Sequence, residues 1–402
     1  MSPYRSLSFR KKLKSFILSQ RQFMLSYETL RIIWWILLSV VCVAFAITDG
    51  FDMGVGGLTR VIGKTDIERR IMINSIAPHW DGNQVWLIVA GGGLFAAWPI
   101  VYAAAFSGFY GAMILVLASL FFRPVGFDYR SKIENPYWRG MWDWGIFIGS
   151  VVPPFIFGLI IGNLLQGVPF HIDEWMRITY IGSFPALFNP FGILTGAIAL
   201  CMFAMHGSAF LLLRTSGSIH VRTKRSVQVA GVLTTVLFLI AGSMVMENIE
   251  GFVLTSQLDH SALSNPLGKT VAQIPGAWLR NYYHNPVLWW LPLTGIVMPL
   301  VSTLFARANH FRLVFLSSSL SILGIISTVA VAMFPFVMPS SSEPNVSLTL
   351  WDSTSSQLTL QIMTVVAGVM VPVILIYTIW CYYKMFVRLD EHMIEENSHS
   401  LY

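Results

Sequence analysis

Charged side chains are scarce in this sequence. Asp, Glu, Lys and Arg make up 11% of its 402 residues and hydrophobic residues 55%, whereas soluble domains carry about 25% charged residues. So little charge excludes an ordinary water-soluble domain. The 14 Trp and 28 Phe suit the aromatic belts of a helical membrane protein. We therefore predict an all-α integral membrane protein. The net charge of +6 does not indicate a nucleic-acid partner, because its location matters more than its size.

Cysteine is nearly absent, and histidine is badly placed for a cofactor. Cys42, Cys201 and Cys381 lie in separate apolar runs, which excludes a disulfide framework, a zinc site or a haem-attachment motif. Of nine histidines, only His206 lies well inside an apolar run, and a bis-histidine haem needs two facing imidazoles. A His–Met pair is the alternative, but the methionines are better explained by packing. We expect no haem and no metal ligated by this chain, and we interpret His206 as a hydrogen-bonded interior histidine.

A basic leader precedes the first apolar run. Residues 1–26 carry six Lys and Arg and lack a long apolar core, so they are a poor signal peptide. We interpret them as a basic N-terminal extension and residues 27–402 as a single polytopic membrane domain. Two alternatives stay open for the leader: the chain starts at Met24, or the leader is an unusual translocated tail.

The remaining sequence contains about nine apolar runs, each near the roughly 20 residues that a bilayer requires. They cover approximately residues 30–48, 83–98, 100–121, 144–165, 190–213, 228–247, 287–305, 313–337 and 361–383. The second run is short and meets the third at Pro99, so the boundary between them is the least defined.

The distribution of Lys and Arg orients these spans. Loops after spans one, three, five and seven, with the C-terminal tail, hold sixteen: Arg60, Lys64, Arg69, Arg70, Arg123, Arg130, Lys132, Arg139, Arg214, Arg222, Lys224, Arg225, Arg307, Arg312, Lys384 and Arg388. Apart from the leader, the other side holds four: Arg31, Arg177, Lys269 and Arg280. The positive-inside rule then predicts a cytoplasmic C-terminus and a periplasmic start of the first span.

One polar stretch stands at the start of a predicted span. In APHWDGNQVW, residues 77–86, Asp81 directly precedes an apolar run, with His79, Trp80 and Asn83 in the same turn. One interpretation is a helix cap, because a carboxylate accepts hydrogen bonds from first-turn N–H groups and is favoured by the helix dipole. The other is a proton or quinone site, because ionisable groups near lipid are costly and usually functional.

Two further acids end the first predicted span. Asp49 and Asp52 in TDGFDMGVGG are three residues apart, hence on one helical face or in the following turn. They are either a polar helix exit terminated by glycines or, with Asp81, the lining of a proton route from the cytoplasm. Arg123, at the end of the third span, is expected first to be a positive-inside anchor. The alternative is that it orients a carboxylate or a cofactor propionate.

The longer motifs carry a resemblance. TDGFDMGVG, RRIMINSIAPHWDGNQVWL, AAFSGFY, LFFRPVGFDYRSK, WDWGIFIGS, GNLLQGVPF, MFPFVMPSS and SLTLWDSTSSQLTL together closely resemble subunit II of the bacterial cytochrome bd-type ubiquinol oxidases, from about Tyr27 to Tyr402. The resemblance implies two four-helix bundles plus one peripheral helix in the inner membrane.

The resemblance also implies which subunit of the complex carries the haems and which residues serve the proton route. The family's complex oxidises ubiquinol and reduces dioxygen to water, generating proton motive force without pumping, and its two haem b groups and one haem d lie in subunit I. The implied partners are subunit I, a small accessory subunit, membrane lipid, and quinol and dioxygen through the complex. Some members bind a ubiquinone in subunit II. The family's proton-route residue falls on Asp81, its other acidic pair on Asp49 and Asp52, and Trp80 matches as a quinone or interface contact.

Two other functions compete with this one. A secondary transporter would also use buried acids, but such transporters often show inverted repeats, and none is apparent here. A purely structural scaffold in the same complex differs only in whether Asp81 titrates during turnover. The resemblance favours an oxidase subunit, with the scaffold alternative left open.

Overall fold

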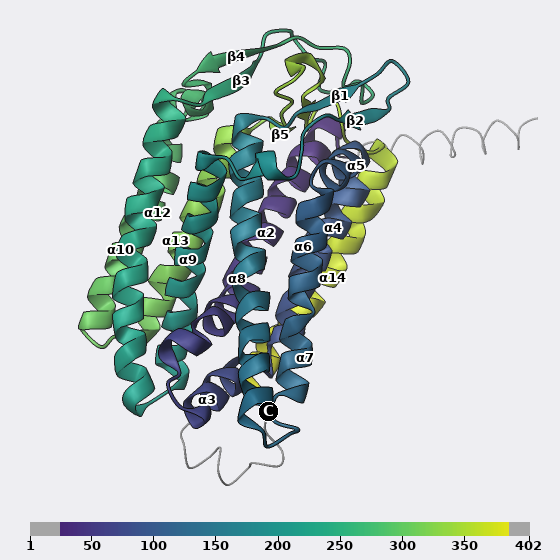
Figure 1. Ribbon diagram of the computed structural model, residues 1–402. Helices are drawn as coiled ribbons and strands as arrows, with labels where there is room; N and C mark the ends of the chain where they lie inside the picture. The colour runs from purple at the N-terminus through teal and green to yellow at the C-terminus, as the bar shows by residue number, and fades with distance from the viewer. Residues whose placement is uncertain (1–24, 386–402) are drawn as a thin grey trace, which may run out of the picture.

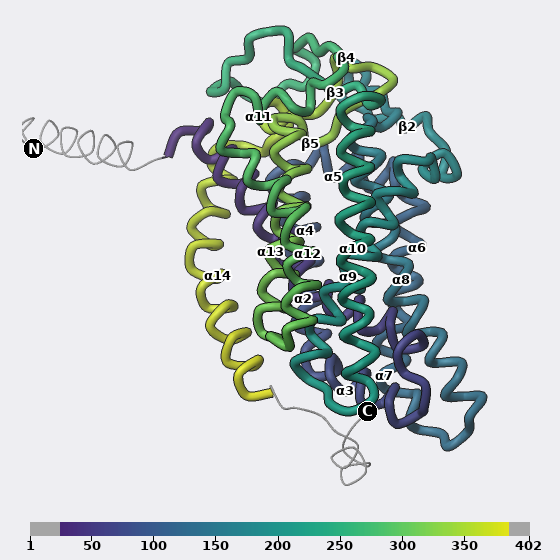
Figure 2. The backbone as a smooth tube through the Cα atoms, turned by 90° about the vertical axis from the view of Figure 1, so that its left-hand side faces the viewer, coloured from purple at the N-terminus to yellow at the C-terminus, as the bar shows by residue number. Residues whose placement is uncertain are grey.

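Two helical bundles stand side by side in the computed structural model, which describes residues 25–385 (Figure 1). The first bundle contains α2 (Tyr27–Ile62), α4 (Trp80–Ala97), α6 (Tyr110–Leu120) with its continuation α7 (Phe122–Tyr129), and α8 (Pro136–Gln166). The second contains α9 (Pro190–Arg214), α10 (Gly217–Glu247), α12 (Trp290–Arg307) and α13 (Phe311–Met333). Helix α14 (Gln357–Met385) lies outside both and packs on α2 and α4 (Figure 2). The predicted architecture of two bundles and a peripheral helix is confirmed.

The spans overlap the predicted runs but differ from them in number and bounds: α8 begins at Pro136 and α10 at Gly217, ahead of the predicted residues 144 and 228. Within the described residues, eight helical segments are long and apolar enough to cross a membrane. Helix α4, the ninth, is not among them because its first turn is polar. The predicted run 100–121 is broken at Phe109 between α5 (Pro99–Gly108) and α6. The first span does not end at residue 48, because α2 continues to Ile62. The expectation that glycines end this helix is therefore wrong: residues 49–56 are all buried, so tertiary packing overrides their weak helix propensity.

Helix α2 joins the two bundles, and glycines allow it to do so. It packs against α8 in its own bundle and α9 in the other. A Cβ atom on Gly54 would lie 1.9 Å from the carbonyl oxygen of Phe203, and one on Gly207 would lie 2.5 Å from the backbone of Gly54. The α2 and α9 backbones thus touch where only glycine fits.

The two ends of the molecule differ (Figure 1). The strand end carries three short antiparallel hairpins, with strands β1 (Phe170–Ile172), β2 (Ile178–Tyr180), β3 (Glu250–Leu254), β4 (Val271–Pro275), β5 (Phe336–Met338) and β6 (Leu348–Thr349). Short helices η1 (Pro185–Leu187), η2 (Ala277–Leu279), α11 (Arg280–His284), η3 (Pro286–Trp289) and η4 (Pro344–Val346) complete its loops. Lys269 and Asp352 form a buried ion pair there, 2.8 Å apart.

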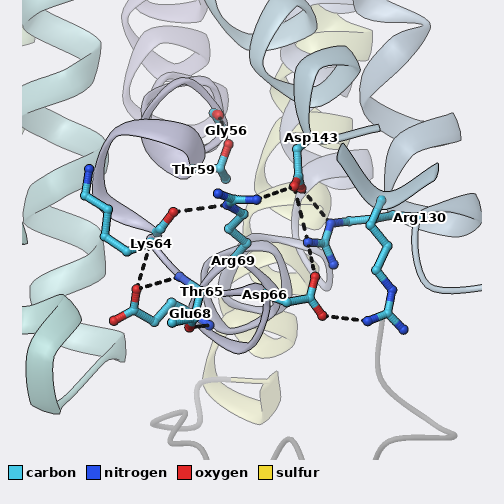
Figure 3. A network of polar contacts seen from close by, with 11 residues as sticks. Gly56, Thr59, Lys64, Thr65, Asp66, Glu68, Arg69, Arg130 and Asp143 are labelled. Carbon is cyan, nitrogen blue, oxygen red and sulfur yellow. Dashed lines mark hydrogen bonds and ion pairs between the residues drawn. The ribbon is translucent and has the colours of Figure 1, made fainter. Parts of the chain in front are cut away.

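The opposite end, here called the α3 end, is held by ion pairs (Figure 3). Helix α3 (Asp66–Ile76) begins with a capping box of Thr65 and Glu68. Arg130 bridges Asp143 of α8 at 2.6 Å and Asp66 of α3 at 2.7 Å. These contacts fix α3 across the base of the first bundle. The predicted leader, residues 1–26, and the C-terminal tail beyond Met385 lie almost wholly outside the described residues.

Glu68 ties α3 to the second bundle. Its Oε1 accepts a 2.6 Å hydrogen bond from Ser218 of α10 and pairs with Arg222. Burial opposes the ionised form, but hydrogen bonds from Ser218, the Lys64 backbone and Arg222 outweigh it and lower the pKa of Glu68 to about 2. The α3 end is therefore one charged layer shared by both bundles.

Candidate functional site

Two carboxylates are buried in the second half of α2. Asp49 and Asp52 have no solvent exposure in this chain. Arg123, at the start of α7, meets Asp49 with both terminal nitrogens: Nη2 donates to Oδ1 at 2.8 Å and Nη1 to Oδ2 at 3.3 Å. Arg123 is itself fully buried. Arg123 therefore orients a carboxylate, which is the alternative expected of it, and its role as a positive-inside anchor stays a prediction.

Asp52 has a different partner. Asn83, in the first turn of α4, donates its amide Nδ2 to Asp52 Oδ2 at 2.7 Å, and Tyr382 of α14 donates its hydroxyl to Asn83 Oδ1 at 2.5 Å. Within residues 25–385, Asp52 Oδ1 has no hydrogen-bond partner. Since one cation serves two buried carboxylates three residues apart, Asp52 holds the less compensated charge of the pair.

His79 closes this cluster towards the α3 end. It is the residue before α4, and its ring stacks on Tyr382 with centroids 4.5 Å apart and an interplanar angle of 3°. Burial, reinforced by the positive charge of Arg214, lowers the pKa of His79 to about 4. The imidazole is therefore neutral at physiological pH.

Asp81 and Trp80 have different surroundings, because Asp81 is exposed and Trp80 is partly buried against the core. Asp81 lies in the first turn of α4, as predicted, and is exposed in this chain. It is not the N-cap, which is His79, and the His79 side chain makes no cap hydrogen bond. Trp80 packs on Phe127 of α7, with ring centroids 5.8 Å apart. The structure brings Asp49, Asp52 and Arg123 together. Asp81 does not join them, because it is exposed in the first turn of α4.

Each residue considered as a cofactor or metal ligand has its own set of contacts. Both nitrogens of His206 are engaged, Nδ1 with Ser318 at 2.8 Å and Nε2 with the Ile47 carbonyl at 2.9 Å, which confirms the interior-histidine interpretation. Across residues 25–385, no group of three or more His, Cys, Asp or Glu is placed to hold a metal ion. Arg123 donates one hydrogen bond from each terminal nitrogen to Asp49, and a propionate or quinone contact at this residue stays a prediction. A quinone contact at Trp80 stays a prediction.

Sequence reasoning noticed His79 and Asn83 beside Asp81 but gave them no role at the site, and it missed Tyr382. For Asn83, the available signal was its position two residues after Asp81 in a polar first turn. Tyr382 lies 299 residues from Asn83 among other aromatic residues of an apolar helix, so no local pattern distinguishes it.

Fold and site together define a polytopic helical membrane protein with acids buried at one end, the class in which intramembrane carboxylates mark proton or ion pathways. The family model for cytochrome bd terminal oxidase subunit II matches residues 30–385. The chain therefore belongs to the cytochrome bd terminal oxidase subunit II family.

Individual relatives agree. The chain is 61% identical over 379 residues to cytochrome bd-I ubiquinol oxidase subunit 2 of Escherichia coli K12, covering 94% of this chain and all of that protein. It is 53% identical, with the same coverage, to a probable cytochrome oxidase subunit 2 of Haemophilus influenzae. Cytochrome bd ubiquinol oxidase subunit 2 of Bacillus subtilis is 30% identical over 361 residues, covering 89% of this chain and 96% of that protein.

A solved structure supports the fold. A chain of the bd oxidase from Geobacillus thermodenitrificans superposes with a TM-score of 0.61 at 13% identity, covering 90% of this chain and 98% of that one. The protein is thus a multi-pass inner-membrane subunit of a haem-containing ubiquinol oxidase complex, an oxidoreductase of electron transport, with subunit I as partner. Because the chain belongs to this family, the alternative of a secondary transporter is set aside.

Proposed function

We propose that this subunit supports the haem-bearing subunit I and provides a proton-uptake route from the cytoplasm for the reduction of dioxygen to water. Asp81 receives the proton at the surface that faces the partner. Asp52, Asn83 and Asp49 form the buried acidic part of the route. The haems b and d belong to subunit I and carry the electrons, so this chain handles protons only and contributes to proton motive force without pumping.

The single observation that carries the proposal is the arrangement of acids around one helix end. Asp52 is bonded to Asn83 at 2.7 Å, two residues from the exposed Asp81 on α4. Asp49 has Arg123 as its cation, whereas Asp52 has only an amide, so a transferred proton is the counter-charge that Asp52 lacks. The polar first turn of α4 thus joins an outer carboxylate to an inner one.

The orientation follows from charge. The α3 end carries the loop arginines, including Arg69, Arg130 and Arg139, and the positive-inside rule assigns this end to the cytoplasm. Helix α14 ends at Met385 at this same end (Figure 1), which supports a cytoplasmic C-terminus and a periplasmic start of α2. Protons would then enter from the side required for building a gradient.

The test is Asp81→Asn in the complete oxidase complex, compared with Asp128→Asn. Asp128 is an exposed carboxylate near the end of α7 at the same end of the chain. If Asp81 transfers protons, its amide variant lowers quinol-dependent oxygen uptake per haem by roughly a hundredfold, the usual contribution of a positioned proton-transfer group. The haem bands of the purified complex keep their normal intensity.

Three outcomes discriminate. Slow turnover with normal haem content in Asp81→Asn alone supports the proton route. Normal turnover with normal yield in both variants refutes it. Loss of assembled complex in Asp81→Asn, with normal turnover in the fraction that assembles, refutes proton transfer and supports the scaffold alternative.

A further inference from the structure

A cavity of about 380 Å³ opens at the α3 end of the second bundle, away from the carboxylate cluster. It lies between the end of α9 and the start of α13 and is lined by Leu212, Leu213, Asn309, His310, Phe311, Arg312 and Leu313. Helix α12 ends at Arg307 and α13 begins at Phe311, so the tight turn between them forms one wall. The residues of the proposed proton route do not line it.

The charges around this cavity have one sign. Lys224 of α10 donates to Asn309 Oδ1 at 2.8 Å and to the Arg307 carbonyl at 3.2 Å, which ties the turn to α10. Arg312 and His310 of the lining are exposed. Residues 215–225 and 304–320 contain no Asp or Glu. Glu68 is bonded to Ser218 and Arg222 of the first segment, and Arg222 neutralises it. Among the residues that line the cavity or hold its turn, the charged side chains Arg312 and Lys224 are therefore both positive.

An apolar strip continues from the cavity along α13. Leu313, Leu316 and Leu320 are 41%, 55% and 36% exposed, and their spacing of three and four residues puts them on one face of the helix. A charged opening at the membrane surface, followed by an exposed leucine face, matches a molecule with an anionic head and hydrocarbon tails.

We propose that this cavity binds the phosphate headgroup of an anionic phospholipid of the cytoplasmic leaflet, with its acyl chains along the leucine face of α13. Arg312 supplies the fixed positive charge and Asn309 and His310 supply hydrogen bonds. Basic pockets between transmembrane helices on the cytoplasmic side bind anionic headgroups in this way. The site is independent of proton transfer through Asp81.

Native mass spectrometry of the delipidated, intact complex tests the assignment. Titration with phosphatidylglycerol is expected to give one retained lipid, and phosphatidylcholine with the same acyl chains none. Arg312→Gln weakens the retained adduct about fivefold, the usual effect of one cation at an anionic surface, and His310→Lys strengthens it by a similar factor. Lys132→Gln is the matched control, because Lys132 is an exposed cation at the same end outside the cavity.

Several results would overturn the proposal. Equal retention of phosphatidylcholine indicates ordinary annular lipid. An equal loss in Lys132→Gln and Arg312→Gln indicates a diffuse charge effect. Displacement of the lipid by excess inorganic phosphate alone assigns the site to free phosphate. Since none of these measurements uses oxygen uptake, they do not depend on the outcome for Asp81→Asn.

Discussion

Tyr382 of α14 donates a 2.5 Å hydrogen bond to Asn83 of α4, and Asn83 in turn donates to Asp52. An ionised carboxylate can only accept, so Asn83 must turn Nδ2 towards Asp52, and the tyrosine hydroxyl then holds the amide in that orientation by donating to Oδ1. The mostly exposed helix α14 thereby positions a residue of the buried cluster. Tyr382 touches Asn83 and not Asp52, so it is a positioning residue.

Removing this hydroxyl should change the proton chemistry without removing the helix. In Tyr382→Phe the ring keeps its stacking on His79, but Asn83 can rotate and withdraw its hydrogen bond from Asp52. We expect the pH dependence of oxygen uptake to shift and turnover to fall, with unchanged haem content. Tyr383→Phe, at the neighbouring exposed position, is the control. An unchanged pH profile in Tyr382→Phe would show that the hydrogen bond has no role in turnover.

The buried ion pair predicts a stability difference between single and double variants. Arg123→Gln leaves Asp49 buried without a cation, which costs about 3–5 kcal/mol when such a pair loses one partner. Asp49→Asn combined with Arg123→Gln removes both charges and should recover most of that loss. The fraction of haem-containing complex that survives a heating series measures both. Equal stability of the single and double variants would contradict a charge-pair role.

Much of the fold could be predicted from sequence because hydrophobic length alone defines a membrane span. Positions of the apolar runs therefore predicted where the long helices lie, although α8 and α10 begin well before the predicted residues 144 and 228. The end of α2 could not be predicted in this way, because its last turns contain acids and glycines that normally end a helix. They stay helical because Asp49 meets Arg123 and Gly54 meets α9, and both contacts are tertiary.

The site was predictable in part for a similar reason. Asp49, Asp52 and Asp81 stand out because acids are rare in apolar sequence, and this rarity is visible without a structure. Arg123 was placed at a span end but assigned to the surface, because a sequence shows depth along a helix and not which side faces a neighbour. Tyr382 has no such chemical contrast, so only the packing of α14 on α4 reveals it.

His79 predicts an acid-side loss of stability. Its pKa is about 4 in the folded chain, because burial and the charge of Arg214 lower it from 6.5. Between pH 4 and 6.5 the unfolded chain binds more protons at this residue than the folded chain does. The free energy of unfolding is therefore highest above pH 6.5 and falls by on the order of 3 kcal/mol as the pH drops towards 4.

His79→Phe keeps an aromatic ring beside Tyr382 but cannot take up a proton. The thermal stability of this variant should therefore lose its dependence on pH between 6.5 and 4 to that extent. His284→Phe, an exposed position at the strand end, should retain the wild-type slope. Identical slopes for all three proteins would mean that His79 is accessible to protons in the folded chain.

The contact between Gly54 and Gly207 predicts the most severe packing defect. A Cβ on Gly207 would lie 2.5 Å from backbone atoms of Gly54 and Val55, which cannot rotate away as a side chain could, so Gly207→Ala must separate α2 from α9 and with them the two bundles. A Cβ on Gly242 of α10 meets no atom within 4 Å, so Gly242→Ala should be neutral or gain up to about 1 kcal/mol from helix propensity. Yield and thermal stability of the complex measure both. Since the two substitutions are chemically identical, a large loss confined to Gly207→Ala locates the cause in the helix crossing, whereas similar behaviour of the two variants would show that the bundles can separate at little cost.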